Sequence, residues 1–493
     1  MSTDPTDPAN PESPRVGVDE WVASHEQRRT HRSGFAGVVE RELARVPSPA
    51  FYLGFGVAAA ILPAVTSNGY VINVGVNTLL YMLLALGLNI TVGYAGLLDL
   101  GYVAFYGFAA YGYAMLASPQ FGLHWDTLAV IPLVVVATAI LGLLVALPSR
   151  RLVGDYLAIV TLFFGELFAT VYQNGESMSL LGFTKPHNIT GGPNGIVNID
   201  QFHVFGARIG ALNYTAYYYV ALVFFMVLLF AAYLVDHSRT GRAWRSLRED
   251  PLAAELMGMP VNRLKLIAFA CGAGIAGLAG TIFAAVNTAV FASEFDFTSG
   301  LLIIVYAMLI LGGAGSLGGV IVGALVVNVS LEVLRDPGHA TWVFYVLIAA
   351  TLVAKLRPWR WLAVIAAGTV GFGFAVHAIV SAVWPRGVHG QAAVGGVLGS
   401  GLSHWVILPS NPVTIGNVAF ISLVLAVLVL TLLKGWAQKL AMIPTLYLAA
   451  FVWENRLVVE PSITRLILVG VILIVLMNAR PQGLLGTSRV EIV

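Results

Sequence analysis

Charged residues and cysteine are both scarce in this sequence. Asp, Glu, Lys and Arg make up 11% of the 493 residues and hydrophobic residues make up 58%. Soluble proteins carry about 25% charged residues, so a soluble globular protein is excluded. The single cysteine, Cys271, excludes an intramolecular disulfide and a cysteine-based metal site. The histidines are scattered and form no metal-ligand cluster, so no metal site is expected.

Two sequence motifs are also missing. The chain has no G-x-x-x-x-G-K-[ST] phosphate loop, which excludes a P-loop ATPase. Residues 1–47 lack the basic start and apolar core of a secretory signal. They are polar, with prolines at Pro5, Pro8, Pro11 and Pro14. We predict a polar N-terminal extension over 1–47, with about fifteen disordered residues followed by an arginine-containing helix on the membrane surface.

Long apolar runs dominate the remainder of the chain. A membrane-spanning helix needs about 20 mostly apolar residues. The sequence therefore predicts an all-α polytopic membrane protein that lies in a lipid bilayer. The predicted spans are 51–66, 70–92, 100–118, 127–147, 155–173, 214–235, 263–286, 300–313, 316–335, 341–357, 361–384, 413–433, 439–453 and 463–478.

The distribution of basic residues predicts the orientation of these spans. Loops rich in Lys and Arg face the cytoplasm. With a cytoplasmic N-terminus, the basic loops after the fourth, sixth, tenth and twelfth spans all lie on that side. Their main basic residues are Arg150, Arg151, the arginines between Asp236 and Lys265, Lys355, Arg357, Arg360, Lys434 and Lys439. Both termini are then cytoplasmic, and the long segments 174–213 and 385–412 lie outside.

The segment Asp236 to Lys265 is a long polar interruption between two apolar spans. Within it, Asp250 suits an N-cap, Pro251 suits the first helical position, and Gly258 suits a helix end. These residues predict a helix of roughly two turns, too short to be stable alone in water. One interpretation is a helix that docks on another protein. The alternative is a solvated loop with one helical turn.

Glycine-rich breaks interrupt two of the apolar runs. The run Val92 to Tyr111 contains Gly93, Gly96 and Asp99 where a plain span would carry Leu or Val. Such a pattern indicates unwound or re-entrant backbone that faces protein or a watery cavity. The second break, Leu311 to Gly323, has glycines at four-residue spacing, which favours close helix packing.

Two carboxylates, Asp99 and Glu166, fall inside predicted spans. A charged carboxylate at the bilayer centre costs about 2.5 to 3.5 kcal/mol on insertion scales, so each needs a polar partner or a cavity. For Glu166, a role in the pathway or gate and a structural hydrogen bond are equally compatible with the sequence. For Asp99, the pattern favours a structural role in which it accepts hydrogen bonds from the broken backbone.

The outer segment 174–213 contains the turn-rich sequence TGGPNGI, from Thr190 to Ile196. Its glycines provide backbone freedom, and Pro193 with Asn194 favours a turn.

Six motifs together resemble the permease subunits of ATP-binding cassette importers for branched-chain amino acids, in particular the LivM-type subunit. The resemblance covers about residues 70–335 densely and returns at the C-terminus. The motifs are ALGLNITVGYAGLLDLGYVAFYGFAAY (Ala85 to Tyr111), TLFFGELF (Thr161 to Phe168), TGGPNGI, GRAWRSLREDPLAAELMGMPVNRLKLIAFACGAGIAGLAG (Gly241 to Gly280), LGGAGSLGGVIVGA (Leu311 to Ala324) and RPQGLLG (Arg480 to Gly486).

The resemblance implies roles for three groups of residues. A cytoplasmic coupling helix at 249–258 would fit a groove on an ATPase subunit, through Glu249, Asp250, Ala253, Ala254, Glu255 and Gly258. Candidates for the translocation pathway are Gly93, Gly96, Asp99, Glu166, Gly312 and Gly313. Candidates for contact with an external binding protein are Thr190, Gly191, Gly192, Pro193, Asn194 and Gly195.

The resemblance also implies partners and a location. It implies two ATPase subunits that carry ATP and magnesium, a second permease subunit of LivH type, and an extracytoplasmic substrate-binding protein. The chain itself would hold no cofactor and bind no nucleic acid. Its expected location is the bacterial cytoplasmic (inner) membrane.

The sequence departs from the family pattern at both ends. Besides the N-terminal extension, about 120 residues separate the ninth span from the RPQGLLG motif. Both ends of this excursion should be cytoplasmic, so it adds an even number of spans, and four fits. We predict a ten-span permease core with about four additional helices: core residues 48–340, additional helices 341–462, and the last core span with the C-terminal end at 463–493.

The sequence therefore favours a permease subunit for branched-chain or related small amino acids, with ATP hydrolysed on partner chains. Within that class, urea or a short amide is an alternative substrate. A different class is a 14-span secondary transporter driven by an ion gradient, with Asp99 or Glu166 carrying protons. A membrane-embedded enzyme or scaffold is a third class, but no clustered catalytic constellation supports it.

Overall fold

The computed structural model describes residues 48–149, 155–177, 188–204, 207–210, 212–355, 359–384, 396–409, 412–459, 461–479 and 483–485. Contacts divide the chain into two units, with the boundary in the sequence between Val65 and Thr66. In the first unit the described element is helix α3 (Ser48–Val65), which contains Pro63. The predicted N-terminal extension, 1–47, lies outside the described residues.

The second unit consists mainly of apolar helices. Counting α3 of the first unit, helices lie within all fourteen predicted ranges. Seven described helices are long and apolar enough to cross a membrane, or up to eight if one bent pair counts as a single span. The class of polytopic membrane protein is therefore confirmed. The seven are α4 (Gly69–Leu88) with its continuation η1 (Asn89–Tyr94), α6 (Thr127–Ser149), α7 (Asp155–Gln173), α8 (Tyr214–Asp236), α11 (Val261–Asn287), α15 (Trp359–Val383) and α17 (Pro412–Leu432).

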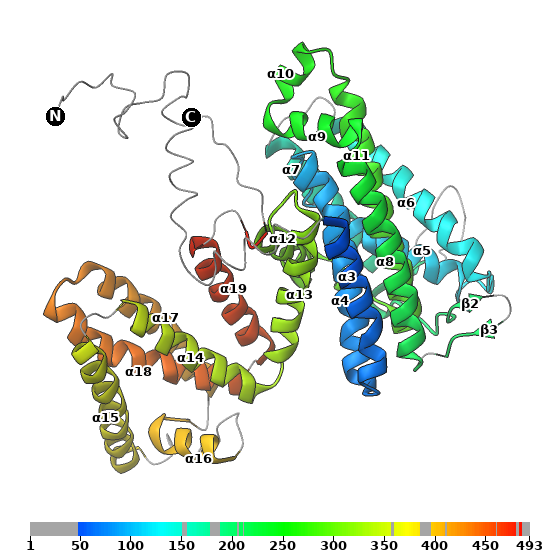
Figure 1. The fold of residues 1–493 in the computed structure, drawn as a ribbon. Helices are drawn as coiled ribbons and strands as arrows, with labels where there is room; N and C mark the ends of the chain where they lie inside the picture. Colours follow the sequence, from blue (N-terminus) through cyan, green and yellow to red (C-terminus); the bar gives the residue numbers. More distant parts are fainter. Residues whose placement is uncertain are drawn as a thin grey trace, which may run out of the picture. The chain divides into compact units, whose positions relative to one another are not determined.

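Helix α11 forms the centre of the first helical bundle, where it packs against α4, α6 and α5 (Tyr102–Leu116) (Figure 1). Small residues make this close packing possible. A Cβ added at Gly280 would lie 3.0 Å from the Cβ of Ala109, and one added at Gly277 would lie 3.0 Å from the Cβ of Thr138. The bundle therefore has no room for larger side chains along this face of α11.

The second half of the bundle pairs α12 (Leu301–Gly312) with α13 (Leu317–Val333), and both contact α4. One buried polar contact joins these elements: Nδ2 of Asn328 on α13 donates to Oγ1 of Thr78 on α4 at 2.7 Å. Since an unpaired amide is costly in an apolar interior, this bond favours one register between α4 and α13.

The two ends of α11 carry different structures. At its N-terminal end lie α9 (Arg239–Glu249) and α10 (Pro251–Leu256), the polar segment predicted from the sequence (Figure 1). At its C-terminal end β4 (Ala289–Val290) pairs antiparallel with β1 (Ile196–Val197). A second short hairpin joins β2 (His203–Val204) to β3 (Ala207–Arg208). The sequence did not predict these strands, because elements this short give little periodicity. Helix α9 was not predicted either, although it has eleven residues.

A second group of helices follows α13. Helix α14 (Pro337–Lys355) follows after a bend of 115°. Next come α15, α16 (Gly396–Trp405), α17, α18 (Trp436–Val459) and α19 (Pro461–Ala479). Helix α18 packs on α15, α17 and α19, and α19 returns to contact α12 and α13. The last helix therefore belongs to the same packed unit as the first bundle.

Candidate functional site

The first glycine-rich break comprises η1 and the irregular segment between η1 and α5. Helix α4 continues as the π-helical turn η1, and regular helix resumes only at Tyr102. Side chains from other helices satisfy the unwound backbone. The hydroxyl of Tyr306 accepts from N of Asp99 at 3.1 Å and donates to its carbonyl at 2.8 Å. Oγ1 of Thr161 accepts from N of Leu100 at 3.0 Å. Irregular backbone persists here because protein surrounds it.

Asp99 is buried at the centre of this break, with 1% of its surface exposed. Its Oδ1 accepts a hydrogen bond from N of Gly101 at 3.1 Å, the kind of contact that the structural interpretation requires. Its Oδ2 has no partner among the described residues. The side chain thus fixes the backbone with one oxygen and leaves the other as a buried acceptor.

The second break joins α12 to α13 through residues 313–316. Gly313 has a φ of 111°, which few residues other than glycine adopt. Two leucines of the C-terminal RPQGLLG motif, Leu484 and Leu485, pair with this break. N of Leu484 donates to the carbonyl of Leu311 at 2.7 Å, and N of Leu485 donates to that of Gly312 at 3.0 Å. No pattern in the sequence predicted that these two motifs lie together.

One arginine connects the two breaks. Nη1 of Arg248, in the last turn of α9, donates to the carbonyl of Gly93 in the first break and, at 3.5 Å, to that of Ala314 in the second. Oδ1 of Asn89 also accepts from N of Gly315 at 2.7 Å. We call these five residues the arginine junction. It joins the two breaks to the polar segment between α8 and α11.

Helix α9 holds Arg248 in place because the helix is anchored to the bundle. Its buried face carries Gly241, Trp244 and Leu247. Nε1 of Trp244 donates to the carbonyl of Leu264 on α11 at 3.0 Å. The spacing of these three buried residues is a helical signal that sequence reasoning had available. The contact of Arg248 was not foreseeable, since it depends on tertiary structure.

Gly96 lies directly against Arg248. Its φ of 69° is in the left-handed region, and a Cβ added there would lie 2.8 Å from Cγ of Arg248. Both the backbone conformation and the close approach therefore require glycine at this position. Of the predicted pathway residues, Gly93, Gly96, Gly312 and Gly313 all lie at or next to the arginine junction.

The predicted docking helix forms as α10, with the predicted caps. Oδ1 of Asp250 accepts from N of Leu252 at 2.8 Å and from N of Ala253 at 3.0 Å. Gly258 follows with a φ of 80°. Among the predicted contact residues Ala254 is buried inside the chain, with 2% of its surface exposed, so it is not available to a partner. The others are exposed: Glu249, Asp250, Ala253, Glu255 and Gly258.

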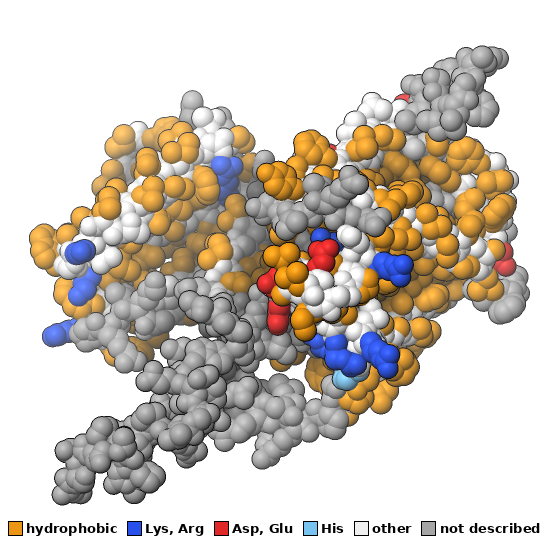
Figure 2. All heavy atoms as spheres, turned by 90° about the horizontal axis from the view of Figure 1, so that it is seen from above, with side chains coloured by type: hydrophobic (Ala, Val, Ile, Leu, Met, Phe, Trp, Pro, Cys, Tyr) orange, Lys and Arg blue, Asp and Glu red, His pale blue; other side chains and the backbone are white. Residues whose placement is uncertain are grey.

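The tip of α10 presents large apolar side chains that sequence reasoning missed. Leu256 and Met257 expose 81% and 83% of their surfaces. Helices α9 and α10 also carry exposed charged side chains, and Figure 2 shows basic and acidic groups gathered at this end among hydrophobic ones. Exposed apolar side chains inside a polar rim are typical of a protein interaction site.

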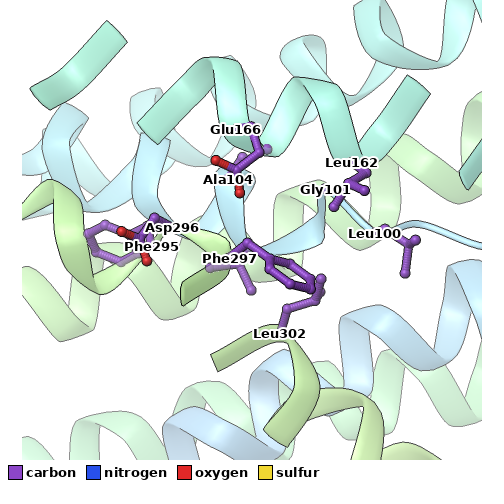
Figure 3. A pocket seen from close by; sticks show the side chains of 11 residues that line it. Leu100, Gly101, Ala104, Leu162, Glu166, Phe295, Asp296, Phe297 and Leu302 are labelled. Atoms are coloured by element: carbon purple, nitrogen blue, oxygen red, sulfur yellow. The ribbon is translucent and has the colours of Figure 1, made fainter. Parts of the chain in front are cut away.

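Glu166 faces a small hollow between α5, α7 and the segment that precedes α12 (Figure 3). The hollow has a volume of about 10 Å³, room for roughly one water molecule. Gly101 and Asp296 line it together with Phe297. Glu166 is exposed and has no hydrogen bond to any described residue. Leu100, which follows Asp99 in the sequence, lines the same hollow, so the structure brings Glu166 close to the first break.

The TGGPNGI segment forms a tight turn at the other end of the bundle. Oγ1 of Thr190 donates to the carbonyl of Tyr172 at 2.6 Å, and N of Gly191 donates to Oδ1 of Asn188 at 2.7 Å. Among the predicted contact residues Thr190, Gly191 and Gly192 are buried and Gly195 is partly buried, whereas Pro193 and Asn194 are exposed. Only these last two present side chains freely to a partner.

Comparisons with known proteins give one consistent family. The family model described as branched-chain amino acid transport system / permease component matches residues 70–356. The high-affinity branched-chain amino acid transport system permease protein LivM of Escherichia coli (strain K12) is 36% identical over 331 residues, which cover 63% of this chain and 73% of that protein.

More distant relatives extend the same pattern. The probable branched-chain amino acid transport permease protein LivM of Methanocaldococcus jannaschii is 26% identical over 328 residues, 56% of this chain and 88% of that protein. The permease protein LivH of Escherichia coli (strain K12) is 28% identical over 113 residues, 22% of this chain and 34% of that protein. No solved structure matches the chain significantly. With its family model matched over more than half of its length, this chain belongs to the permease components of branched-chain amino acid transport systems.

Proposed function

We propose that this chain is the LivM-type permease subunit of an ATP-driven importer for branched-chain or related small amino acids. The names of its relatives in Escherichia coli support this substrate class. Two ATPase subunits bind and hydrolyse ATP with magnesium, a LivH-type permease pairs with this chain, and an external protein delivers the substrate. The assembly lies in the bacterial cytoplasmic membrane, with both termini of this chain in the cytoplasm.

The observation that carries this proposal is the contact of Arg248 with both glycine-rich breaks. Helix α9 is anchored to α11, and α10 follows it directly. A movement imposed on α10 by an ATPase subunit is transmitted by α9 to Arg248. Because Arg248 bonds to Gly93 and to Ala314, that movement reaches both breaks together. The breaks are the flexible points at which the pathway opens and closes on the cytoplasmic side.

The remaining site residues act along the route of the substrate. Pro193 and Asn194 contact the external binding protein. Two carboxyl groups line the pathway from there toward the arginine junction. They are those of Glu166 at its hollow and Asp99 in the first break. A zwitterionic substrate in a bilayer needs such polar partners, since unpaired charges there are costly.

We also propose that the fourteen predicted ranges all span the membrane, as a ten-span core with four additional helices. The core comprises residues 48–340 and, from 463 onward, the last span. The packing of α19 on α12 and α13 supports this division. Residues 341–462 form the additional helices, and most of them lie beyond the family match, which ends at residue 356.

Uptake by reconstituted vesicles tests the class of transporter. We expect accumulation of leucine only when ATP, the co-purified ATPase subunits and the external binding protein are all present. Accumulation of leucine driven by an ion gradient alone, without ATP, would establish the secondary transporter instead. Parallel assays with urea and acetamide test the substrate. ATP-driven uptake of either compound without uptake of leucine would identify that compound, and not an amino acid, as the substrate.

A double substitution at the tip of α10 tests the docking surface. We expect Leu256→Asp with Met257→Asp to abolish co-purification of the ATPase subunits, since two carboxylates would have to be buried in an apolar contact. Both side chains are exposed in the free chain, so its folding should be unaffected. Leu212→Asp, on an equally exposed residue outside this surface, is the matched control. Wild-type recovery of ATPase with the double variant would contradict the assignment.

A further inference from the structure

Helices α14, α17, α18 and α19 line a cavity of about 580 Å³ that is open along one side. Ile467 and Val471 in its wall each expose 47% of their surfaces. Its walls are almost entirely apolar. Representative lining residues are Phe344 on α14, Phe420 on α17, Leu446 on α18 and Leu468 on α19. Three of these four helices lie beyond the family match, so the permease function does not account for the cavity.

Packed side chains make the walls of this cavity rigid. The rings of Phe344 and Trp453 stack face to face with centroids 4.4 Å apart, and both residues line the cavity. Trp453 also belongs to a buried apolar cluster with Leu457 and Leu468. Where no atoms fill this open cavity, its lining forfeits dispersion contacts. An occupant that restores those contacts is therefore favoured.

One cation lines this apolar space. Arg456, near the end of α18, donates from Nη2 to Oδ1 of Asn417, and its guanidinium lies 5.9 Å from the ring centroid of Phe420. Within the described part of the chain no carboxylate pairs with it. The neighbouring Glu454 is directed elsewhere, with Oε1 accepting from the hydroxyl of Tyr345 at 3.3 Å. Arg456 thus has donors and a positive charge available for an anion.

The position of Arg456 makes the cavity amphipathic. Arg456 and Thr464 both line it, and they lie on either side of the turn that joins α18 to α19. Most of the other lining residues are aliphatic or aromatic. A ligand that matches this arrangement has one anionic end and a long apolar body. Water does not match, because a dry apolar cavity offers too few hydrogen-bond partners.

We propose that this cavity binds an amphiphile with an anionic headgroup and an acyl chain, the headgroup on Arg456 and the chain among the four helices. A phospholipid with a net negative charge and a free fatty acid share this chemistry. Guanidinium groups bind phosphate and carboxylate oxygens in the same forked geometry. The bound chain fills the space between α14 and the α17–α18 pair, so it stabilises these helices in the folded unit.

Native mass spectrometry of the full-length chain, with the subunits that co-purify, tests the site. The protein is exchanged into detergent containing phosphatidylglycerol, phosphatidylcholine or palmitate. We expect one retained molecule of phosphatidylglycerol or palmitate per chain, and the adduct mass tells the two sources apart. Equal retention of phosphatidylcholine, or no retained molecule at all, would overturn the proposal.

Two variants with matched controls locate the ligand. Leu446→Trp fills the cavity and should abolish retention, whereas Leu440→Trp, on an exposed position of the same helix outside the cavity, should not. Arg456→Gln should weaken retention of the anionic amphiphile about tenfold, the loss expected for one charge-assisted hydrogen bond. Arg360→Gln removes an exposed arginine on α15 and should have no effect.

Folding of each variant is checked by its elution as a single species and by recovery of the co-purifying subunits. If Leu446→Trp fails that check, Ala449→Phe, which lines the same cavity, takes its place. Undiminished retention in a folded cavity-filling variant refutes the site. Undiminished retention in Arg456→Gln refutes the headgroup assignment.

Discussion

Arg248→Ala is expected to reduce ATP-driven uptake by more than tenfold while the permease still assembles with its ATPase subunits. The substitution removes the side chain that bonds to both Gly93 and Ala314. Hydrogen bonds to charged groups contribute about 1.5 to 3 kcal/mol each, so the loss of one or both suffices for a tenfold effect. Helix α9 keeps its anchor through Trp244, so the docking surface itself remains.

The expected signature of this variant is uncoupling. ATP hydrolysis by the complex should continue at a rate within about threefold of wild type while uptake falls, because Arg248 acts between the ATPase contact and the breaks. Arg245→Ala is the matched control. Arg245 lies on the same helix but pairs with Asp236 at 2.9 Å on the surface, an interaction of small value. If Arg248→Ala and Arg245→Ala showed equal uptake, Arg248 would have no role in coupling ATP hydrolysis to transport.

Gly96→Ala is expected to impair uptake about as strongly as Arg248→Ala, because it changes the other residue of the contact between Gly96 and Arg248. An alanine at a φ of 69° costs about 1 to 2 kcal/mol in backbone strain. Its Cβ would also approach Cγ of Arg248 to 2.8 Å, so either the arginine or the first break must shift. Both consequences disturb the arginine junction. Uptake of radiolabelled leucine by vesicles measures the effect.

Gly122 provides the control that separates strain from contact. It has a similar φ of 66°, but an added Cβ would meet no atom within 4 Å. Gly122→Ala should therefore carry the strain without the clash and leave uptake within about twofold of wild type. If Gly96→Ala and Gly122→Ala reduced uptake equally, backbone strain alone would explain the effect. The close approach to Arg248 would then have no functional role.

The sequence predicted those features that depend on local chemistry. Apolar runs of bilayer length gave the helices, and Asp250, Pro251 and Gly258 gave α10 with its caps, because propensity and capping act within a few residues. The turn at Pro193 and Asn194 was predictable for the same reason. The sequence also located both breaks, since glycine clusters are unusual in apolar helices.

Contacts between distant segments were beyond the reach of such reasoning. The pairing of Arg248 with Gly93 and Ala314 depends on how α9 folds back onto the bundle, and no spacing in the sequence encodes it. The burial of Ala254 has the same origin: a six-residue helix shows too little periodicity to reveal which face packs inward. The family resemblance predicted a docking role for α10, whereas its exposed apolar tip became visible only in the structure.

The pairing of the RPQGLLG motif with the second break also sets an order of events during biosynthesis. The carbonyls of Leu311 and Gly312 receive their donors from Leu484 and Leu485, which the ribosome makes after all of the helices α14 to α19. While α14 to α19 are being inserted, these two carbonyls must remain hydrated or unsatisfied. The permease bundle is therefore completed only after Leu485 has been made. A chain terminated before these leucines would leave the two carbonyls without their donors, a defect that membrane quality-control proteases can recognise.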